Sequence, residues 1–227
     1  MSLKLENFCD EAIGDLQDNT ITTFFGPPGC GKTTLCFHYI ISALKENKKV
    51  IFVDTEGGFS PERLKQIYPD VDLSKIIVLN PKSFESQQKI ISNLNRDIKN
   101  SKTIGLVIID SLVMLYRLKL GDSPQKINKE LAEQLRLLTE ISRTFSIPVI
   151  VTNQMYVNFE TKEKKMVGGT LIEYWSKTIV ELEKEQDQKK LILKKHKFKK
   201  EGECAYYDIQ NEGFCKSKSQ RGFNFFK

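Results

Sequence analysis

Apolar and polar residues along the chain form blocks that predict alternating strands and helices. From Pro124 to Phe145 the apolar positions recur every three or four residues, which predicts a long helix with one buried face. Shorter runs of β-branched and aromatic residues predict buried parallel strands. These runs lie at Ile21 to Phe25, Lys49 to Asp54, Ile76 to Leu79, Ile104 to Asp110 and Pro148 to Asn153. The pattern is typical of an α/β protein with a mostly parallel central sheet flanked by helices.

The pattern changes in the last quarter of the chain. Three strand-like runs follow one another without a helix-length segment between them, at Thr178 to Leu182, Leu191 to His196 and Cys204 to Ile209. They predict an antiparallel extension of the sheet. A length of 227 residues fits one domain over 1–227. Its basic and aromatic end, residues 215–227, is a candidate flexible tail.

Composition and charge narrow the class of protein. No apolar run approaches the eighteen or so residues of a membrane span, and no charged and apolar leader is visible, so we expect a soluble, cytoplasmic protein with no membrane partner. The five cysteines show no metal-binding spacing and indicate reduced thiols. The net charge of +6 is unevenly placed, because seven lysines lie between Lys189 and Lys200. An acidic partner is therefore expected.

One run carries the clearest chemistry. It has the form G-x-x-x-x-G-K-T and consists of Gly26, Pro27, Pro28, Gly29, Cys30, Gly31, Lys32 and Thr33. It lies between a predicted strand and a helix predicted from Lys32 to Glu46. Backbone N–H groups from Gly29 to Thr34 can surround a β-phosphate at the start of that helix. We predict that the run binds ATP, with Lys32 at the β- and γ-phosphates and Thr33 as a ligand of Mg²⁺; an ordinary glycine turn is the alternative.

Polar residues follow the predicted strands where each one ends. Asp110 closes an apolar strand, which is the usual position of a magnesium-binding carboxylate in this class of site. Glu56 follows the strand that ends at Asp54, and Gln154 follows Asn153. Ligands bind at the carboxyl ends of parallel strands, so we expect these side chains near the phosphates.

Taken together, these landmarks resemble the core of the RecA-type recombinases, and in particular their short archaeal paralogs that consist of the ATPase core alone. The residues that carry the resemblance are Gly26 to Thr33, Val53 to Gly57, Val107 to Ser111, Val151 to Gln154 and Gly168-Gly169, with Pro61 to Leu64 and Glu173 to Lys177. The resemblance implies a RecA-like P-loop NTPase fold. It also implies that the strand of Gln154 lies between the phosphate-loop strand and the strand of Asp110.

The resemblance also implies roles for single residues. Glu56 would orient the attacking water, Gln154 would sense the γ-phosphate, and Arg63 would stack on adenine. A carboxylate that accepts a proton from water in line with the γ-phosphate is what hydrolysis requires. By position alone, Glu56 is equally well a solvated turn residue and Arg63 a plain surface arginine.

Candidate DNA contacts follow from the resemblance and from the lysines. The loops from Tyr116 to Gly121 and from Met155 to Val167 occupy the positions of the two DNA-contacting loops of the recombinases. Lysines in the second loop and in the basic strand could contact phosphates, which predicts sequence-independent binding of single-stranded and duplex DNA. The alternative for the basic strand is an edge strand whose lysines prevent aggregation. The candidate residues are Lys162, Lys164, Lys165, Lys194, Lys195 and Lys197.

The predicted function is an accessory protein of DNA repair and homologous recombination. We expect a weak DNA-dependent ATPase that binds DNA and assists the main recombinase. The segment from Gln220 to Phe226 resembles peptides that dock on sliding clamps, which makes a clamp a candidate partner.

The N-terminal helical domain and the aromatic linker of the strand-exchange enzymes are missing, so an oligomer is allowed but a long filament is not expected. The alternatives are a nucleotide-gated interaction module without turnover, a RecA-fold signalling ATPase and a small-molecule P-loop kinase. A kinase would need an arginine-rich lid, and no compact one is visible.

Overall fold

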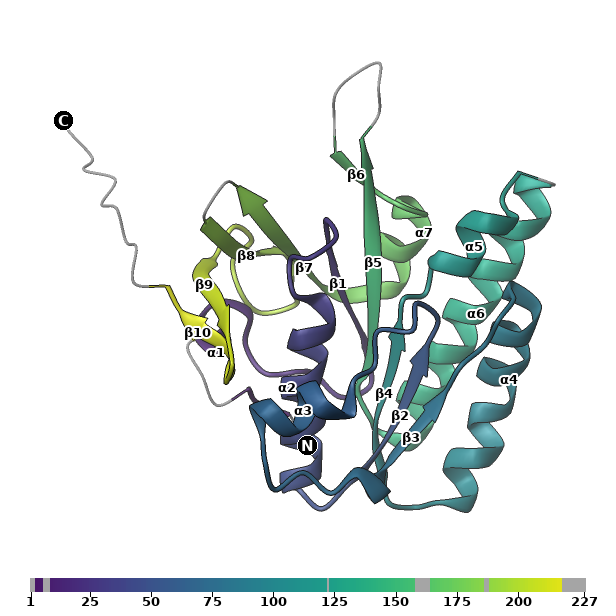
Figure 1. Ribbon diagram of the computed structural model, residues 1–227. Coiled ribbons are helices and arrows are strands. Elements are labelled where there is room, and N and C mark those ends of the chain that lie inside the picture. The colour runs from purple at the N-terminus through teal and green to yellow at the C-terminus, as the bar shows by residue number, and fades with distance from the viewer. Residues whose placement is uncertain (1–2, 6–8, 122, 158–163, 186–187, 218–227) are drawn as a thin grey trace.

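The protein is built around one long, mostly parallel sheet with helices on both of its faces (Figure 1). The computed structural model describes residues 3–5, 9–121, 123–157, 164–185 and 188–217. The strand order across the sheet is β10-β9-β8-β7-β1-β5-β4-β2-β3, and β6 pairs with β5. Within these residues, no helix is both long and apolar enough to cross a membrane.

The parallel part of the sheet agrees with the predicted strands. It contains β1 (Ile21–Gly26), β2 (Lys49–Asp54), β3 (Ile76–Leu79), β4 (Ile104–Asp110) and β5 (Val149–Val157). β5 lies between β1 and β4, so the predicted place of the Gln154 strand is confirmed. Short apolar runs form strands here because both faces of the sheet are covered by helices.

Two groups of helices cover the two faces and enclose two apolar cores (Figure 1). On one face lie α1 (Cys9–Ile13), α2 (Lys32–Lys45) and α3 (Pro61–Ile67), and a 3₁₀ turn at Leu73–Lys75 precedes β3. The other face carries α4 (Phe84–Asn100), α5 (Met114–Lys119), α6 (Pro124–Phe145) and α7 (Gly169–Trp175). The predicted apolar stripe of α6, from Ile127 to Ile141, is buried.

The carboxyl-terminal part forms the predicted antiparallel extension. β7 (Ser176–Glu185) runs parallel to β1, and β8 (Gln188–Lys195), β9 (Cys204–Gln210) and β10 (Gly213–Lys216) follow as antiparallel neighbours. The edge-strand interpretation of the basic strand is wrong, because β8 pairs with both β7 and β9. The first residues of the expected tail, Cys215 and Lys216, belong to β10. The candidate clamp peptide from Gln220 to Phe226 lies outside the described residues.

The loop expected from Met155 to Val167 is partly a hairpin. β5 continues to Val157 and pairs with β6 (Lys164–Met166), so that Met155 lies opposite Met166. The sequence Met155-Tyr156-Val157 has the aromatic and β-branched character of a strand, and it extends β5 past the end of β1. Lys162 lies outside the described residues.

Candidate nucleotide site

The sheet brings the polar strand ends to one edge, beside the glycine-rich loop. In the register of the parallel strands, Gly26 of β1 lies opposite Gln154 of β5, and Asp54 of β2 lies opposite Asp110 of β4. The loop leads directly from β1 into α2, whose first residue is Lys32. Four neighbouring strands therefore supply one site, although its residues are spread along the chain from Gly26 to Gln154.

Glycine is required at two positions of the loop by close contacts. A Cβ on Gly26 would lie 2.2 Å from the carbonyl oxygen of Leu182, and a Cβ on Gly31 would lie 2.5 Å from Cδ1 of Ile209. Gly31 also has a φ of 102°, which disfavours other residues. The loop is therefore confined on one side by β7 and β9, so a ligand of its backbone N–H groups would bind from the other side.

Lys32 and Thr33 make the contacts expected of a phosphate and magnesium site. The Nζ of Lys32 donates hydrogen bonds to the carbonyl oxygens of Gly26 at 2.9 Å and Pro27 at 3.0 Å, so the ammonium group lies over the loop. The Thr33 hydroxyl donates to Oδ2 of Asp110 at 2.7 Å. The structure thus joins the two predicted magnesium ligands in one contact.

Asp110 is a buried carboxylate at the end of β4. Its Oδ1 accepts a short hydrogen bond from the hydroxyl of Thr152, on β5. Burial raises the pKa of Asp110, the hydroxyl hydrogen bonds oppose this rise, and the charges of Glu56 and Asp54 add to it. A bound cation would offset the unfavourable burial of the charge.

Asp54 organises the turn that carries Glu56. Its Oδ1 accepts hydrogen bonds from the backbone N–H groups of Glu56, Gly57 and Gly58 at 2.8 to 3.2 Å. Its Oδ2 accepts a further one from the N–H of Phe59 at 3.0 Å. Both carboxylate oxygens of Asp54 therefore hold the backbone of the turn, which is a structural task. Glu56 is the exposed acidic side chain of the same turn.

Glu56 and Gln154 are in direct contact. Oε1 of Glu56 accepts hydrogen bonds from the Ser111 hydroxyl at 2.6 Å and from Nε2 of Gln154 at 2.8 Å. Oε1 of Gln154 in turn accepts one from Nη1 of Arg117, on α5, at 2.8 Å. The two residues predicted to act at the γ-phosphate are therefore joined, and sequence reasoning missed both Ser111 and Arg117 as their partners.

The β9–β10 hairpin packs against the phosphate loop, which the sequence did not indicate. The hydroxyl of Tyr207 donates to the carbonyl oxygen of Cys30 at 2.6 Å, and the ring of Tyr207 stacks on Phe214 with centroids 4.3 Å apart. The N–H of Phe214 donates to Nε2 of His38, on α2, at 2.9 Å. Burial raises the pKa of the Cys30 thiol, which favours the neutral form.

Arg63 lies against the turn of the same hairpin. Its guanidinium donates to the carbonyl oxygens of Gln210 at 2.6 Å and Asn211 at 3.1 Å. Arg63 is therefore held in place by residues that lie 147 and 148 positions away in the chain. Its stacking on adenine stays a prediction.

The lysines predicted to contact DNA do not form one stripe. On β8, Lys194 forms an ion pair with Glu181 at 3.3 Å, and Lys195 donates to the carbonyl oxygen of Glu173 at 2.6 Å. Lys197 follows β8, and its Nζ lies 4.9 Å from the ring centroid of Phe198. Leu191 and Leu193 are buried as expected, but β7 supplies carboxylates to the outer face and neutralises part of its charge.

The two lysine groups also lie at different levels of the sheet. Lys195 pairs with Ile179, which lies beside Thr23 in the middle of β1. Lys164 and Lys165 belong to β6, which pairs with β5 beyond Gln154 and so beyond the carboxyl end of β1. Of the described lysines that are candidates for DNA contact, those of β6 therefore lie nearest the edge that carries the candidate nucleotide site.

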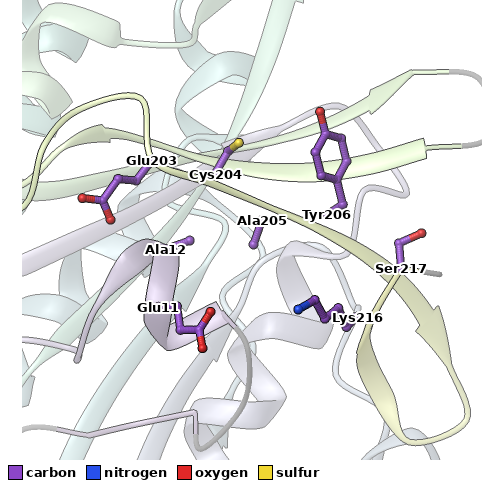
Figure 2. A pocket seen from close by; sticks show the side chains of 8 residues that line it. All are labelled: Glu11, Ala12, Glu203, Cys204, Ala205, Tyr206, Lys216 and Ser217. Atoms are coloured by element: carbon purple, nitrogen blue, oxygen red, sulfur yellow. The ribbon is translucent and has the colours of Figure 1, made fainter. Parts of the chain in front are cut away.

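A cavity of about 350 Å³ lies between α1 and the β9–β10 hairpin, away from the predicted site residues (Figure 2). Glu11 and Glu203 supply its carboxylates, and Tyr206 lies on the same strand as the exposed Cys204. None of the predicted site residues lines it.

Comparisons with known proteins place the chain in a family. The Rad51 family model matches residues 5–217. A DNA repair and recombination protein RadB from Methanosphaera stadtmanae is 40% identical over 207 residues, which cover 88% of this chain and 89% of that protein. The RadB of Methanobrevibacter smithii is 37% identical over 219 residues, which cover 92% of each chain.

A solved structure agrees with this result. A crystal structure of the RadB recombinase is 32% identical, has a TM-score of 0.78, and covers 93% of this chain and 98% of its own. The RecA-like fold and the resemblance to the short paralogs are thus confirmed. The chain belongs to the Rad51 family and, within it, to the RadB group of DNA repair and recombination proteins.

Proposed function

We propose that the chain binds ATP with Mg²⁺ at the loop from Gly26 to Thr33 and hydrolyses it slowly. The observation that carries this proposal is the 2.7 Å hydrogen bond from Thr33 to Asp110, which joins the phosphate loop to a buried carboxylate. A hydroxyl and a carboxylate are hard oxygen ligands of the kind that Mg²⁺ prefers. The rest of its shell would come from phosphate oxygens and water.

The residues present fit both groups. Lys32 donates to two carbonyl oxygens of the loop and, at 3.8 Å, to the sulfur of Cys30, and these uncharged acceptors are readily exchanged for phosphate oxygens. The buried Asp110 gains a partner if a cation binds beside Thr33. Among the described residues, no cluster of three or more His, Cys, Asp or Glu side chains could hold a metal by itself, which agrees with an ion held jointly by protein and nucleotide.

Each residue of the site then has one task in hydrolysis. Lys32 binds the β- and γ-phosphates, and the N–H groups of the loop hold the β-phosphate in position. Thr33 and Asp110 would hold the magnesium ion, which would neutralise charge on the phosphate oxygens. Glu56 accepts the proton of the attacking water, and Gln154, which contacts Glu56, senses whether a γ-phosphate is present.

We propose further that the chain binds DNA without strong sequence preference and assists a recombinase. Lys165 and Lys197 are exposed cations on two different parts of the surface. Phe198, beside Lys197, is 72% exposed and offers a ring on which a base can stack. The relatives are named for DNA repair and recombination, which supports this role.

The decisive experiment is ATP turnover by the purified chain, alone, with single-stranded DNA and with duplex DNA. We expect slow hydrolysis that depends on magnesium and rises with DNA. A Lys32→Ala variant controls for contaminating ATPases. Absence of both ATP binding and turnover would contradict the proposal, whereas binding without turnover would leave a nucleotide-gated interaction module.

A further inference from the structure

The hydrogen bonds around Glu56 continue outward to Arg117, in the segment from Tyr116 to Gly121 that was predicted as a DNA-contacting loop and that lies mostly in helix α5. Ser111 and Gln154 both donate to Oε1 of Glu56, at 2.6 and 2.8 Å, and Arg117 donates to Oε1 of Gln154 at 2.8 Å. Arg117 lies on α5, which begins shortly after Asp110 on β4. Four side chains from three parts of the chain therefore form one line of hydrogen bonds that reaches the surface.

This line fixes the direction of the Glu56 carboxylate. Oε1 receives two donors, and Oε2 accepts no hydrogen bond from the described part of the chain. The carboxylate thus has one oxygen held by the protein and one left for water. A base held in this way needs little reorganisation before it accepts a proton.

Arg117 settles the orientation of the amide between it and Glu56. A guanidinium only donates and a carboxylate only accepts, so the Gln154 amide satisfies both neighbours in one orientation, with Oε1 toward Arg117 and Nε2 toward Glu56. Without the guanidinium, the amide oxygen loses this partner and the side chain is free to turn toward solvent. Oε1 of Glu56 would then keep only the Ser111 hydroxyl.

We propose that Arg117 is a positioning residue for hydrolysis, which holds Glu56 in its working orientation through the amide of Gln154. The inference rests on the proposed function, because it concerns the rate of the same reaction. Within the described residues Arg117 donates to Gln154 and not to the phosphate loop, so the proposed task concerns the rate of hydrolysis rather than the binding of nucleotide.

The role predicts a change in rate and not in fold or affinity. Arg117 is exposed, and exposed charged contacts contribute little to stability. Replacing Arg117 by methionine keeps the aliphatic stem and removes the donors. We expect kcat for ATP to fall about tenfold, because a displaced catalytic group loses much of its effect. The KM and the ATP affinity should stay within about twofold of the original protein.

Two variants test the chemistry of the contact. Arg117→Lys retains one cationic donor and should recover most of the lost rate. Arg96→Met is the matched control, because it removes an exposed arginine of α4 whose partner within the described residues is its neighbour Asp97, at 3.3 Å. Its turnover should equal that of the original protein. All turnover is measured with the same saturating homothymidine oligonucleotide.

A double-mutant cycle with Gln154 tests the path. If Arg117 acts through Gln154, then Arg117→Met should change kcat by less than about twofold once Gln154→Ala is present. The full tenfold loss in that background would overturn the inference, since Arg117 would then act by another route. An unchanged kcat in the single Arg117→Met variant would overturn it as well.

The side-chain amide of Gln154 gives a readout that needs no turnover. Its NMR signals can be assigned by their loss in Gln154→Ala, and they should shift in both Arg117→Met and Glu56→Gln. A signal that does not move in Arg117→Met would overturn the inference even if the chain never hydrolyses ATP. Different results would contradict the proposed function itself. These are the absence of ATP turnover in the original protein, or unchanged turnover in Glu56→Gln.

Discussion

At the scale of single residues, Asp54 and Glu56 show how neighbouring acids acquire different tasks. Asp54 accepts four backbone hydrogen bonds and shapes the turn, whereas Glu56 faces the end of β5 and contacts Gln154. Both residues lie at the end of the same strand, so their positions in the sequence do not show which task each one has. The separation comes from the three-dimensional direction of each side chain.

The role of Glu56 is tested by Glu56→Gln. The new amide oxygen can still accept from Ser111 and Gln154, so the side chain should stay in place while its proton-accepting carboxylate is lost. We expect ATP affinity to be unchanged and turnover to fall by about 100-fold or more, the usual effect of a lost general base. Glu62→Gln, an exposed acid on α3, is the control. Unchanged turnover would make Glu56 a solvated turn residue.

Lys32→Ala tests the phosphate contact. The Lys32 ammonium group is the cation that lies over the loop, and its loss removes the point charge that pairs with the β- and γ-phosphates. We expect the Kd for ATP to rise more than about tenfold, or about 1.4 kcal/mol, by equilibrium binding. Lys65→Ala on α3 should bind normally. Normal ATP binding by Lys32→Ala would contradict the assignment.

The same scale shows what the sequence could predict. The phosphate loop has fixed spacing within eight residues, and Asp110 ends an apolar run, so local pattern was enough for both. Arg117 contacts Gln154, 37 positions away, and Tyr207 contacts Cys30, 177 positions away. The sequence around Arg117 and Tyr207 contains no pattern that predicts these contacts. Such long-range contacts depend on the order of the strands in the sheet, which local sequence motifs do not predict.

At the scale of elements, the β9–β10 hairpin forms one edge of the sheet and also packs against the phosphate loop. It contacts the loop through Tyr207, the start of α2 through Gly31, and α3 through Arg63. β9 was predicted as a strand but β10 was not, and the position of the hairpin beside the loop was not predicted either. β8 was likewise predicted as a strand, and its place between β7 and β9 agrees with the predicted succession of three strands joined by turns, so that only the edge-strand alternative was wrong.

The contact between His38 and the hairpin makes stability depend on pH. Burial and the nearby charge of Arg63 lower the pKa of His38 from 6.5 to about 4, so the folded state favours the neutral ring that accepts from Phe214. The stabilising effect is complete above pH 6.5 and is lost as the pH falls from 6.5 toward 4. Between pH 7.5 and pH 5 we expect a loss of about 2 kcal/mol in the free energy of unfolding.

Urea unfolding of the original protein and of His38→Gln measures this term. Glutamine can accept the same hydrogen bond but does not titrate, so the variant should lose less stability than the original over this interval, by about 2 kcal/mol. The difference between the two proteins removes the contribution of His196, whose pKa is also lowered, mainly by burial. Equal losses in both proteins would show that His38 is not the titrating group.

At the scale of the whole molecule, charge and sheet order divide the surface between two ends. The β6 hairpin lies beyond the edge that carries Gln154, and the lysines at the end of β8 lie toward the opposite edge. The described lysines that are candidates for DNA contact therefore lie in two separate regions of the sheet. Composition predicted an acidic partner, but it could not show this division.

A substitution of Lys197 tests which of the two regions of the sheet contacts DNA. Lys194 is paired with Glu181 at 3.3 Å, whereas Lys197 is exposed beside the exposed ring of Phe198. Lys197→Gln should weaken duplex binding and reduce the slope of log affinity against log salt by about 0.9, the contribution of one phosphate contact. Lys194→Gln should reduce the slope less, because Lys194 already shares its charge with a carboxylate. ATP affinity should be the same in both variants. The opposite result would be a full salt slope in Lys197→Gln and a reduced salt slope in Lys165→Gln, a substitution on β6. DNA would then bind at the nucleotide edge of the sheet, and the lysines at the end of β8 would serve another purpose.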